Sequence, residues 1–303
     1  MEGSRHLPVL LSEVLEYLAC QPDRVYVDGT LGSGGHARAI LERSSPTGRL
    51  IGLDWDEQAI QRAKENLAGF GNRVELQKEN FKDLRWVLKS LSLTAVHGIL
   101  LDLGVSTEQL EDREKGFSFR WDGPLDMRMS RETKITAQDL LRKLSVWEIS
   151  GILRQYGEER WANRISRAIG RQRQTRAIQT TRELVEVIEK SVPFHRGRIH
   201  PATRTFQALR IAVNDEMGNL KTFLAECPDL LLPGGRLCII SFHSLEDRIV
   251  KNHFRQWAKG PEGGSPSFRI LTPKPVVPSS AEVLSNPKAR SAKLRVAEKL
   301  SEP

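Results

Sequence analysis

The segment that most constrains the fold is Val-Tyr-Val-Asp-Gly-Thr-Leu-Gly-Ser-Gly-Gly-His at residues 25–36, an apolar run that ends in Asp28 and continues into a glycine-dense turn. β-Branched and aromatic residues at 25–27 favour a buried parallel strand. Four glycines within seven positions allow positive φ angles and let a ligand approach the main chain closely. Residues 37–43 are good helix formers, so the turn is predicted to open a helix whose free N–H groups point at a ligand.

The turn alone is compatible with two cofactors. Gly32-x-Gly34-x-x-Ala37 fits the fingerprint of dinucleotide-binding proteins. The run Asp28-Gly-Thr-Leu-Gly-Ser-Gly-Gly fits equally well the acidic, glycine-rich loop that holds S-adenosylmethionine. The choice between them depends on residues further along the chain.

Three more predicted strands end in polar loops, and they cover residues 49–54, 73–77 and 96–102. Asp54 ends the second strand, where a carboxylate can accept hydrogen bonds from the two hydroxyls of a ribose. Phe81 lies in the loop after the third strand, and Asp102 ends the fourth. Ligands of open α/β sheets bind at these carboxyl ends, so the four loops predict one ligand site.

The next predicted core strand, 235–242, starts about 130 residues after the fourth, although a parallel crossover unit needs only about 30 residues. We therefore predict an insertion. Residues 1–106 and 205–303 are expected to form a Rossmann-like α/β domain, and residues 107–204 an all-helical subdomain. Ser244 and Asp247 are the expected start of the helix that follows the fifth strand.

Charge is concentrated in one part of the chain. Residues 154–210 hold 13 Lys and Arg against 5 Asp and Glu, a net charge of +8, so the remainder carries 33 of each sign. The excess is almost entirely arginine, whose planar guanidinium suits phosphate and stacks on bases. This pattern predicts a nucleic-acid surface that includes Arg171 and Arg173. The alternative is a solvated helix face in which Arg160, Arg164, Arg167 and Arg171 have local acidic partners.

Other features narrow the class of protein. No apolar run approaches the roughly 18 residues of a membrane span, and the first residues lack a signal-peptide pattern, so a cytoplasmic protein without membrane contact is expected. Cys20, Cys227 and Cys238 form no C-x-x-C pair, so they are predicted to be reduced core thiols, and no metal site is expected.

Acids at the first, second and fourth strand ends favour a nucleoside that carries a charged amino-acid tail. Carboxylates repel a pyrophosphate but accept hydrogen bonds from ribose hydroxyls and from an ammonium group. The turn Leu-Leu-Pro-Gly-Gly-Arg-Leu at 231–237 and a late edge strand at 294–298 also resemble Rossmann-like methyltransferases. A nicotinamide-dependent oxidoreductase remains an alternative that fits less of the chain.

Seven strings in series make the resemblance specific. They are Asp28-Gly-Thr-x-Gly-x-Gly-Gly-His36, Leu101-Asp-Leu-Gly-Val-Ser106, Gly116-Phe-Ser-Phe119, Asp122-Gly-Pro-Leu-Asp-Met-Arg-Met129, Tyr156-Gly-Glu-Glu-Arg160, His200-Pro-Ala-Thr-Arg-Thr-Phe-Gln207 and Ile240-Ser-Phe-His-Ser-Leu-Glu-Asp-Arg248. The chain, from His6 almost to its C-terminus, thereby resembles the bacterial family that methylates N4 of a cytosine in small-subunit ribosomal RNA.

The resemblance implies a class I methyltransferase sheet with a helical insertion, S-adenosylmethionine as the donor, and a cytosine in the decoding region of 16S rRNA as the acceptor. The substrate is free 16S rRNA or the small ribosomal subunit, and the oligomeric state is open, with a homodimer as one option. By position, the family's cofactor contacts fall on Gly34, Gly35, His36, Asp54, Phe81, Asp102 and Gln109. Two alternatives of other kinds are a methyltransferase of this fold that acts on another RNA or DNA cytosine, and a nucleic-acid-binding module without turnover.

Several candidates have a structural alternative. Asp102 is the catalytic candidate, as an acceptor for the cytosine amino group, or else it holds the methionine tail of the cofactor. His243 contacts the substrate or bonds Glu246. His200 and Arg204 are expected either to bind RNA phosphate or to belong to a hydrogen-bonded network at a hinge. Phe117, Phe119 and Trp121 stack on a flipped cytosine or, the preferred interpretation, pack the insertion.

Overall fold

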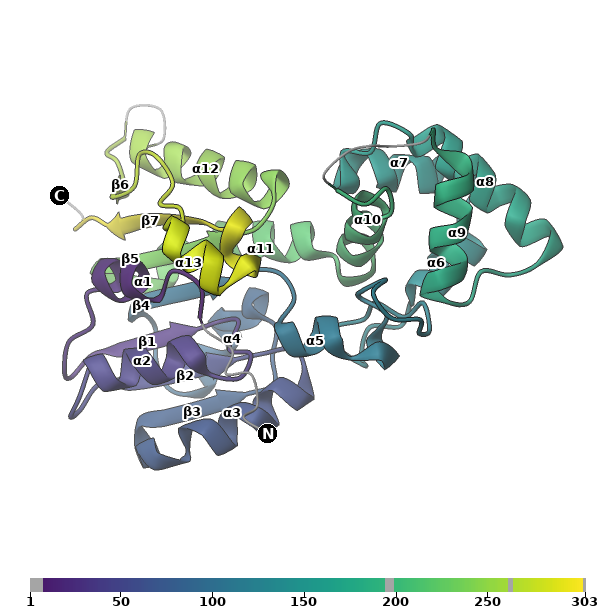
Figure 1. The fold of residues 1–303 in the computed structure, drawn as a ribbon. Coiled ribbons are helices and arrows are strands. Elements are labelled where there is room, and N and C mark those ends of the chain that lie inside the picture. The colour runs from purple at the N-terminus through teal and green to yellow at the C-terminus, as the bar shows by residue number, and fades with distance from the viewer. Residues whose placement is uncertain (1–7, 194–198, 261–263, 302–303) are drawn as a thin grey trace. The chain divides into compact units, whose positions relative to one another are not determined.

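The computed structural model describes residues 8–193, 199–260 and 264–301, so His6, where the resemblance begins, lies outside the described residues. The chain divides into two compact units (Figure 1). The first consists of Met1–Gly104 and Gly218–Pro303, and the second of Val105–Met217. Each unit has its own hydrophobic core and is described by itself.

The first unit is built on a seven-stranded sheet of order β3-β2-β1-β4-β5-β7-β6. Its strands are β1 (Val25–Asp28), β2 (Arg49–Leu53), β3 (Val74–Gln77), β4 (Val96–Asp102), β5 (Leu231–Ser241), β6 (Phe268–Ile270) and β7 (Lys293–Lys299). Strands β1 to β5 run parallel, and β7 runs antiparallel to both β5 and β6. This mixed α/β sheet confirms the predicted Rossmann-like class I methyltransferase fold.

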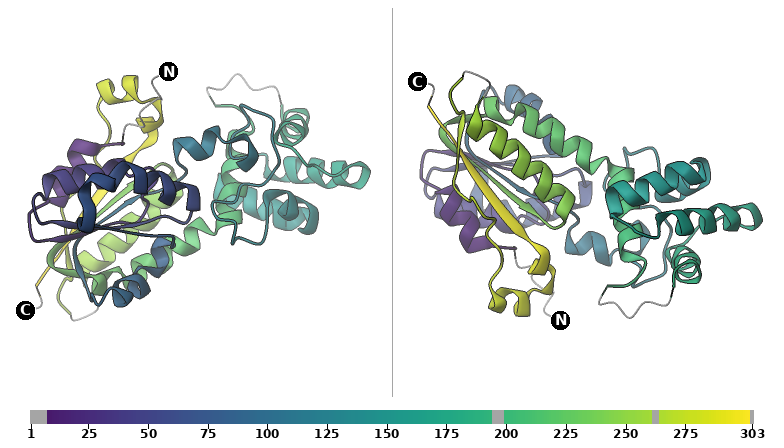
Figure 2. Two further views of the ribbon diagram at one scale, coloured as in Figure 1. Left: turned by 90° about the horizontal axis from the view of Figure 1, so that it is seen from below. Right: turned by 90° about the horizontal axis from the view of Figure 1, so that it is seen from above.

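Helices cover both faces of this sheet, as the two views of Figure 2 show. They are α1 (Leu11–Leu18), α2 (Gly35–Arg43), α3 (Glu57–Leu67), α4 (Leu84–Ser90), α11 (Glu216–Leu230), α12 (Ser244–Lys259) and α13 (Ser280–Ser285). Successive strand residues point to opposite faces, so Val27 of β1 enters one core with Phe223 of α11, and Tyr26 enters the other with Ile40 of α2. Burial on both sides explains the nearly continuous apolar runs of the parallel strands.

The cysteines of the sheet unit are unpaired, as predicted. Cys227 and Cys238 are buried in the two cores, and Cys20 is partly buried. Burial raises the pKa of the Cys20 thiol to about 12, so it stays protonated and unreactive at neutral pH.

Helix α12 begins one residue earlier in its capping pattern than predicted. The N-cap is His243, whose ring accepts a hydrogen bond from Glu246 N, while Phe242 N donates to the Glu246 carboxylate at 2.9 Å. The predicted partner, Asp247, instead receives two hydrogen bonds from Arg295 of β7. The prediction from Ser244 and Asp247 was wrong because the Asp247 carboxylate is hydrogen-bonded to Arg295, which lies 48 residues away on another strand.

The described residues of the second unit form helices and irregular loops, with one isolated bridge between Pro124 and Thr180 in place of β-strands. Its helices are α5 (Thr107–Glu111), α6 (Ala137–Lys143), α7 (Val146–Gly157), α8 (Ala162–Thr175), α9 (Thr181–Ser191) and α10 (Thr203–Asn214). The unit ends after Met217, not after Arg204 as predicted. Helix α10 belongs to it because Phe206 and Leu209 are buried in the same core as Leu153 of α7.

Within the described part of the chain, every helix is too short or too polar to cross a lipid bilayer.

Candidate active site

Three carboxylates follow neighbouring parallel strands at one edge of the sheet. Asp28 of β1 pairs in register with Gly52 of β2 and with Leu100 of β4. Asp54 and Asp102 lie two residues beyond these partners, so all three acids are at the carboxyl ends of adjacent strands. The acids predicted from separate strand patterns therefore lie at one site.

Backbone hydrogen bonds hold the glycine turn against the strands on both sides. Gly29 N donates to Leu100 O on β4, and Leu31 N donates to Leu53 O on β2, each at 2.9 Å. The hydroxyl of Thr30 accepts a hydrogen bond from Asp102 N at 2.6 Å. The turn and the end of β4 are thus fixed relative to each other.

Asp54 organises the other side of the turn. Its carboxylate accepts from Gly32 N and from Asp56 N, both at 2.8 Å. The N-cap of α3 is Asp56, which accepts from Gln58 N. Asp56 and not Asp54 therefore caps the helix, and the partly exposed Asp54 carboxylate lies beside the turn.

Gly34 allows the turn to enter α2. Its φ of 87° lies in the left-handed region, and a β-carbon there would lie 3.2 Å from the Leu67 side chain. Gly34 is the N-cap of α2, and no side chain of the described residues caps this helix start. The N-terminus of a helix suits a negatively charged group such as a ligand carboxylate.

His36 connects α2 to the end of β4. Its Nε2 lies 2.9 Å from Val9 O, and since a carbonyl only accepts, Nε2 holds the proton. Its Nδ1 then faces Asp102 Oδ2 at 3.8 Å. The ring itself, and not only the His36 backbone, is therefore part of the site.

Two of the three carboxyl groups, Asp28 and Asp102, are buried without a cation or enough hydrogen-bond donors in the described part of the chain to stabilise their negative charge. Asp28 is 1% exposed, and burial, with Asp54 as a further negative neighbour, raises its pKa to about 7. Burial also raises the pKa of Asp102 well above its ordinary value, and Asp28 and Glu246 add to the rise. Asp28 Oδ2 and Asp102 Oδ1 are buried oxygens without a hydrogen-bond partner among the described residues. These oxygens fit a ligand that brings positive charge or N–H donors.

Phe81 and His243 border the same edge. A β-carbon on Gly29 would lie 3.1 Å from Phe81 Cβ, and the Phe81 ring packs edge-on against Phe223 at 5.8 Å between ring centroids. His243 Nδ1 accepts a hydrogen bond from Glu246 N at 3.4 Å, so the structural alternative, a bond to Glu246, is present. Contact between His243 and a substrate stays a prediction.

The other candidates lie in the second unit, each with its own partners. Gln109 closes a capping box with Ser106 at the start of α5, so its role as a cofactor contact stays a prediction. His200 accepts from Ala202 N and lies 3.2 Å from Glu189 Oε1, and Arg204 donates to Glu158 O at 3.1 Å. These contacts match the predicted alternative of a local structural network.

Arg171 and Arg173 differ in their surroundings. Arg173 Nη1 donates to Leu141 O at 2.7 Å and to Leu144 O at 2.5 Å, so it caps the end of α6. Arg171 is exposed, and no residue in the described ranges pairs with it. Of the two predicted RNA contacts, Arg171 alone presents a free guanidinium.

The aromatic residues of the insertion mainly pack. Phe117 is buried in the core, and Phe119 lies against His200 and Phe206 with ring centroids 4.7 and 5.0 Å away. Trp121 is partly exposed and stacks under the Arg113 guanidinium at 4.4 Å. Packing, the preferred interpretation, therefore holds for Phe117 and Phe119.

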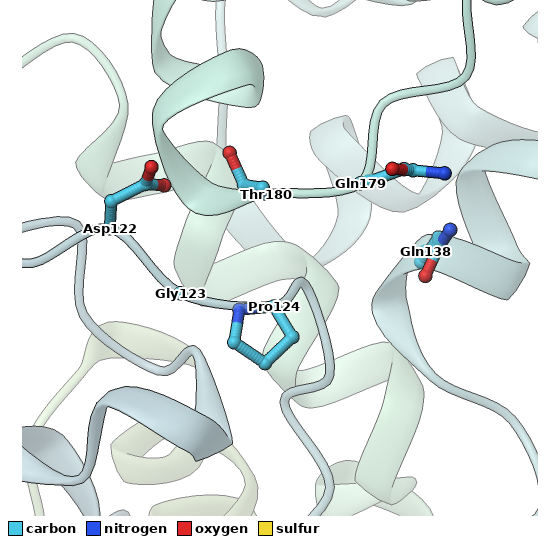
Figure 3. A pocket seen from close by; sticks show the side chains of 6 residues that line it. All are labelled: Asp122, Gly123, Pro124, Gln138, Gln179 and Thr180. Atoms are coloured by element: carbon cyan, nitrogen blue, oxygen red, sulfur yellow. The ribbon is translucent and has the colours of Figure 1, made fainter.

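A cavity of about 420 Å³ opens in the second unit. Its lining residues are Asp122, Gly123, Pro124, Gln138, Gln179 and Thr180 (Figure 3). Amide side chains and one carboxylate line this cavity, without a cation, so it differs chemically from the glycine turn and from an anion site.

Sequence reasoning missed the role of Thr30, and it identified Glu246 only as a partner of His243 and not as a neighbour that raises the pKa of Asp102. Thr30 was part of a quoted motif, but nothing in its position indicated that its hydroxyl binds the Asp102 backbone. Glu246 is only 2% exposed, which is rare for a glutamate. Its position results from the capping contacts at the start of α12 and not from any local charge pattern.

The family model of the MraW methylases matches residues 3–300. The chain belongs to the MraW methylase family. The curated relative "Ribosomal RNA small subunit methyltransferase H" of Geobacter sulfurreducens is 53% identical, covering 97% of this chain and 99% of its own. Proteins of the same name from Heliobacterium modesticaldum and Geotalea daltonii are each 50% identical, covering 97% and 99% of this chain and 98% and 100% of their own.

The cofactor of this methylase is S-adenosylmethionine, and the site fits it. Asp54 and the turn suit the ribose, and the unpartnered oxygens of Asp28 and Asp102 suit the cationic methionine part. A dinucleotide would place its pyrophosphate beside three carboxylates, so the alternative of a nicotinamide-dependent oxidoreductase is set aside.

Proposed function

We propose that this methylase transfers a methyl group to the exocyclic N4 of a cytosine in the decoding region of 16S rRNA. The names of its relatives support a small-subunit rRNA substrate, and the seven strings of the sequence support cytosine N4. The observation that carries the chemistry is the Asp102 carboxyl, which lies beside the glycine turn with a raised pKa and an unpartnered oxygen.

The amino group of cytosine is a weak nucleophile because its lone pair is delocalised into the ring. S-Adenosylmethionine supplies an electrophilic methyl group when bound. The Asp102 carboxylate accepts a hydrogen bond from the N4 amino group, which favours the pyramidal form of the nitrogen. As N4 gains the methyl group it loses one proton, and a carboxylate of raised pKa is a better acceptor for that proton than an ordinary aspartate.

The rest of the site positions Asp102. The Thr30 hydroxyl accepts a hydrogen bond from its backbone N–H at 2.6 Å, and His36 Nδ1 lies 3.8 Å from its other oxygen, Oδ2. Positioning of this kind contributes much of the acceleration when no covalent nucleophile is used. The cysteines are protonated core thiols, in agreement with a direct transfer.

RNA binding is assigned to the second unit, through the α8 arginine face, which we define as Arg164, Arg167 and Arg171. All three are exposed, α8 contains no acidic residue, and none of the three forms an ion pair within the described ranges. Like charges three and four residues apart cost the free helix a few tenths of a kcal/mol per pair. Phosphates relieve that repulsion.

The test is transfer of labelled methyl groups to small subunits and to 16S rRNA from a strain that lacks the modification, followed by nuclease digestion and mass spectrometry. We expect one labelled N4-methylcytidine in the decoding region. Label on another RNA or on DNA would support the alternative acceptor instead. RNA binding without any transfer would leave only a binding module.

Asp102→Asn tests the chemical step. We expect a fall of at least about 100-fold in kcat because the amide no longer accepts the proton. Equilibrium binding of labelled S-adenosylmethionine separates the two roles of Asp102. A donor affinity that falls as much as kcat/KM would assign it to the cofactor alone.

A further inference from the structure

Trp147 is the most exposed tryptophan among the described residues, with 83% of its surface accessible. It is the second residue of α7. Large aromatic side chains are normally buried or placed at binding surfaces, because they carry much apolar area. The fold of the second unit does not use this indole, whereas Ile149 and Leu153 of the same helix are fully buried in the core.

The residues one helical turn after Trp147 do not cover its indole. Helical side chains lean toward the N-terminus, so the residues at i+3 and i+4 are those that cover residue i. For Trp147 these are Ser150, which donates to Asn163 of α8 at 2.7 Å, and Gly151. A long side chain at 151 would project along the same helix face as the indole, since residues four apart are neighbours on a helix surface.

Gly151 has no explanation in the fold. Its φ is not positive, and a β-carbon there would meet nothing within 4 Å. Glycine inside a helix costs roughly 1 kcal/mol relative to alanine. The chain thus keeps a destabilising residue one helical turn after Trp147, where no packing contact with a described residue requires glycine.

The indole and the α8 arginine face belong to neighbouring helices of the second unit. Helices α7 and α8 contact each other through Ser150 and Asn163, and a β-carbon on Gly170 would lie 2.6 Å from Val146. Their buried residues face the core. At 100° per residue, the remaining stripes, Trp147–Gly151–Arg154 on α7 and the arginine face on α8, both point away from the core.

We propose that Trp147 and Gly151 form a stacking platform for an unpaired nucleobase of the RNA substrate, with the neighbouring arginines on its phosphates. This inference rests on the proposed function and adds a contact outside the methyl-transfer site. An RNA nucleotide fits because its base is planar and stacks on indole without need of a specific edge, and its phosphate brings the negative charge that these arginines lack. The Glu148 carboxylate beside Trp147 is already held by Ser145 N at 2.7 Å.

The experiment measures the Kd of a 16S rRNA transcript and of small subunits for the full chain at several salt concentrations. Trp147→Ala is expected to raise both Kd values on the order of tenfold, the loss of one base stack, and Trp147→Phe to raise them less. Because stacking is not ionic, the dependence of Kd on salt should stay as in the wild type. Arg171→Ala should instead reduce that dependence.

Gly151→Leu gives an independent test, since it covers the indole without removing it. We expect an unchanged or higher Tm together with weaker RNA binding. Trp86→Ala is the matched control, because Trp86 is 60% exposed on α4 of the other unit, and RNA binding should not change.

The proposal is overturned if Trp147→Ala binds the transcript like the wild type, or if Gly151→Leu leaves RNA binding intact. An effect on small subunits without one on the transcript would also overturn it, and would assign Trp147 to a ribosomal protein. Failure of the proposed function is distinguishable, since the wild type itself would then neither bind nor methylate the RNA.

Discussion

Replacement of Asp28 by asparagine should stabilise the cofactor-free protein at alkaline pH. Asp28 is buried at the end of β1, with one oxygen bound to Thr30 N and the other without a partner among the described residues. Asparagine has the same shape and keeps an acceptor for Thr30 N, but it cannot ionise. The substitution therefore isolates the free-energy cost of the buried charge.

The size of the effect follows from the pKa of Asp28. Folding raises it from 3.8 to about 7, so the folded state binds the proton more tightly than the unfolded state. The stability from that proton is fully present below pH 3.8 and is lost as the pH rises to about 7. Above pH 7 the loss amounts to about 4 kcal/mol. Between pH 5 and pH 8 the free energy of unfolding of the variant should gain about 2–3 kcal/mol relative to that of the wild type.

The assay is urea unfolding of both proteins at pH 5 and pH 8 without S-adenosylmethionine, whose positive charges would stabilise the carboxylate. The quantity to compare is the difference in unfolding free energy between variant and wild type, and how it changes from pH 5 to pH 8. All other groups titrate in both proteins and cancel in this difference. Asp23→Asn is the matched control for the chemical change, since Asp23 is exposed. A difference for Asp28→Asn that is the same at both pH values would refute the reasoning.

Two further predictions concern single contacts. Asp54→Ala removes the acceptor for Gly32 N and Asp56 N, so we expect binding of labelled S-adenosylmethionine to weaken at least tenfold and the free energy of unfolding to fall by about 1–3 kcal/mol; unchanged affinity would exclude Asp54 from the cofactor site. Arg173→Ala leaves the α6 carbonyls unbonded and should lower the free energy of unfolding by about 1–3 kcal/mol. Arg171→Ala should leave the free energy of unfolding unchanged and weaken RNA binding. If Arg171→Ala and Arg173→Ala destabilise the protein equally, the assignment of Arg173 as a cap and Arg171 as an RNA contact is contradicted.

The sheet and its acids were predictable because strong local signals coincide. Apolar runs, a glycine turn and a carboxylate at each strand end are readable one strand at a time, and the rule that ligands bind at carboxyl ends joins them. The His36 ring was harder to place, because its contacts to Val9 and Asp102 join residues that are distant in sequence.

The errors have a common physical cause. The pattern of α10 shows an apolar face but not which core that face enters, so the boundary was placed at its start. Arg171 and Arg173 look alike in the sequence, and only the contact between α6 and α8 makes one of them a cap. At α12 the local rule for a helix start was sound, but Arg295 on a remote strand took the expected carboxylate.

The insertion between β4 and β5 also bears on how the chain folds. Ile99 pairs with Leu237, so forming this central ladder closes a very long loop. The entropy of loop closure rises with the logarithm of the loop's length, and contacts so distant in sequence slow folding. The second unit has a hydrophobic core of its own between those strands. If it condenses first, it shortens the loop that β4 and β5 must close, and a defect in its core would delay assembly of a sheet that it does not belong to.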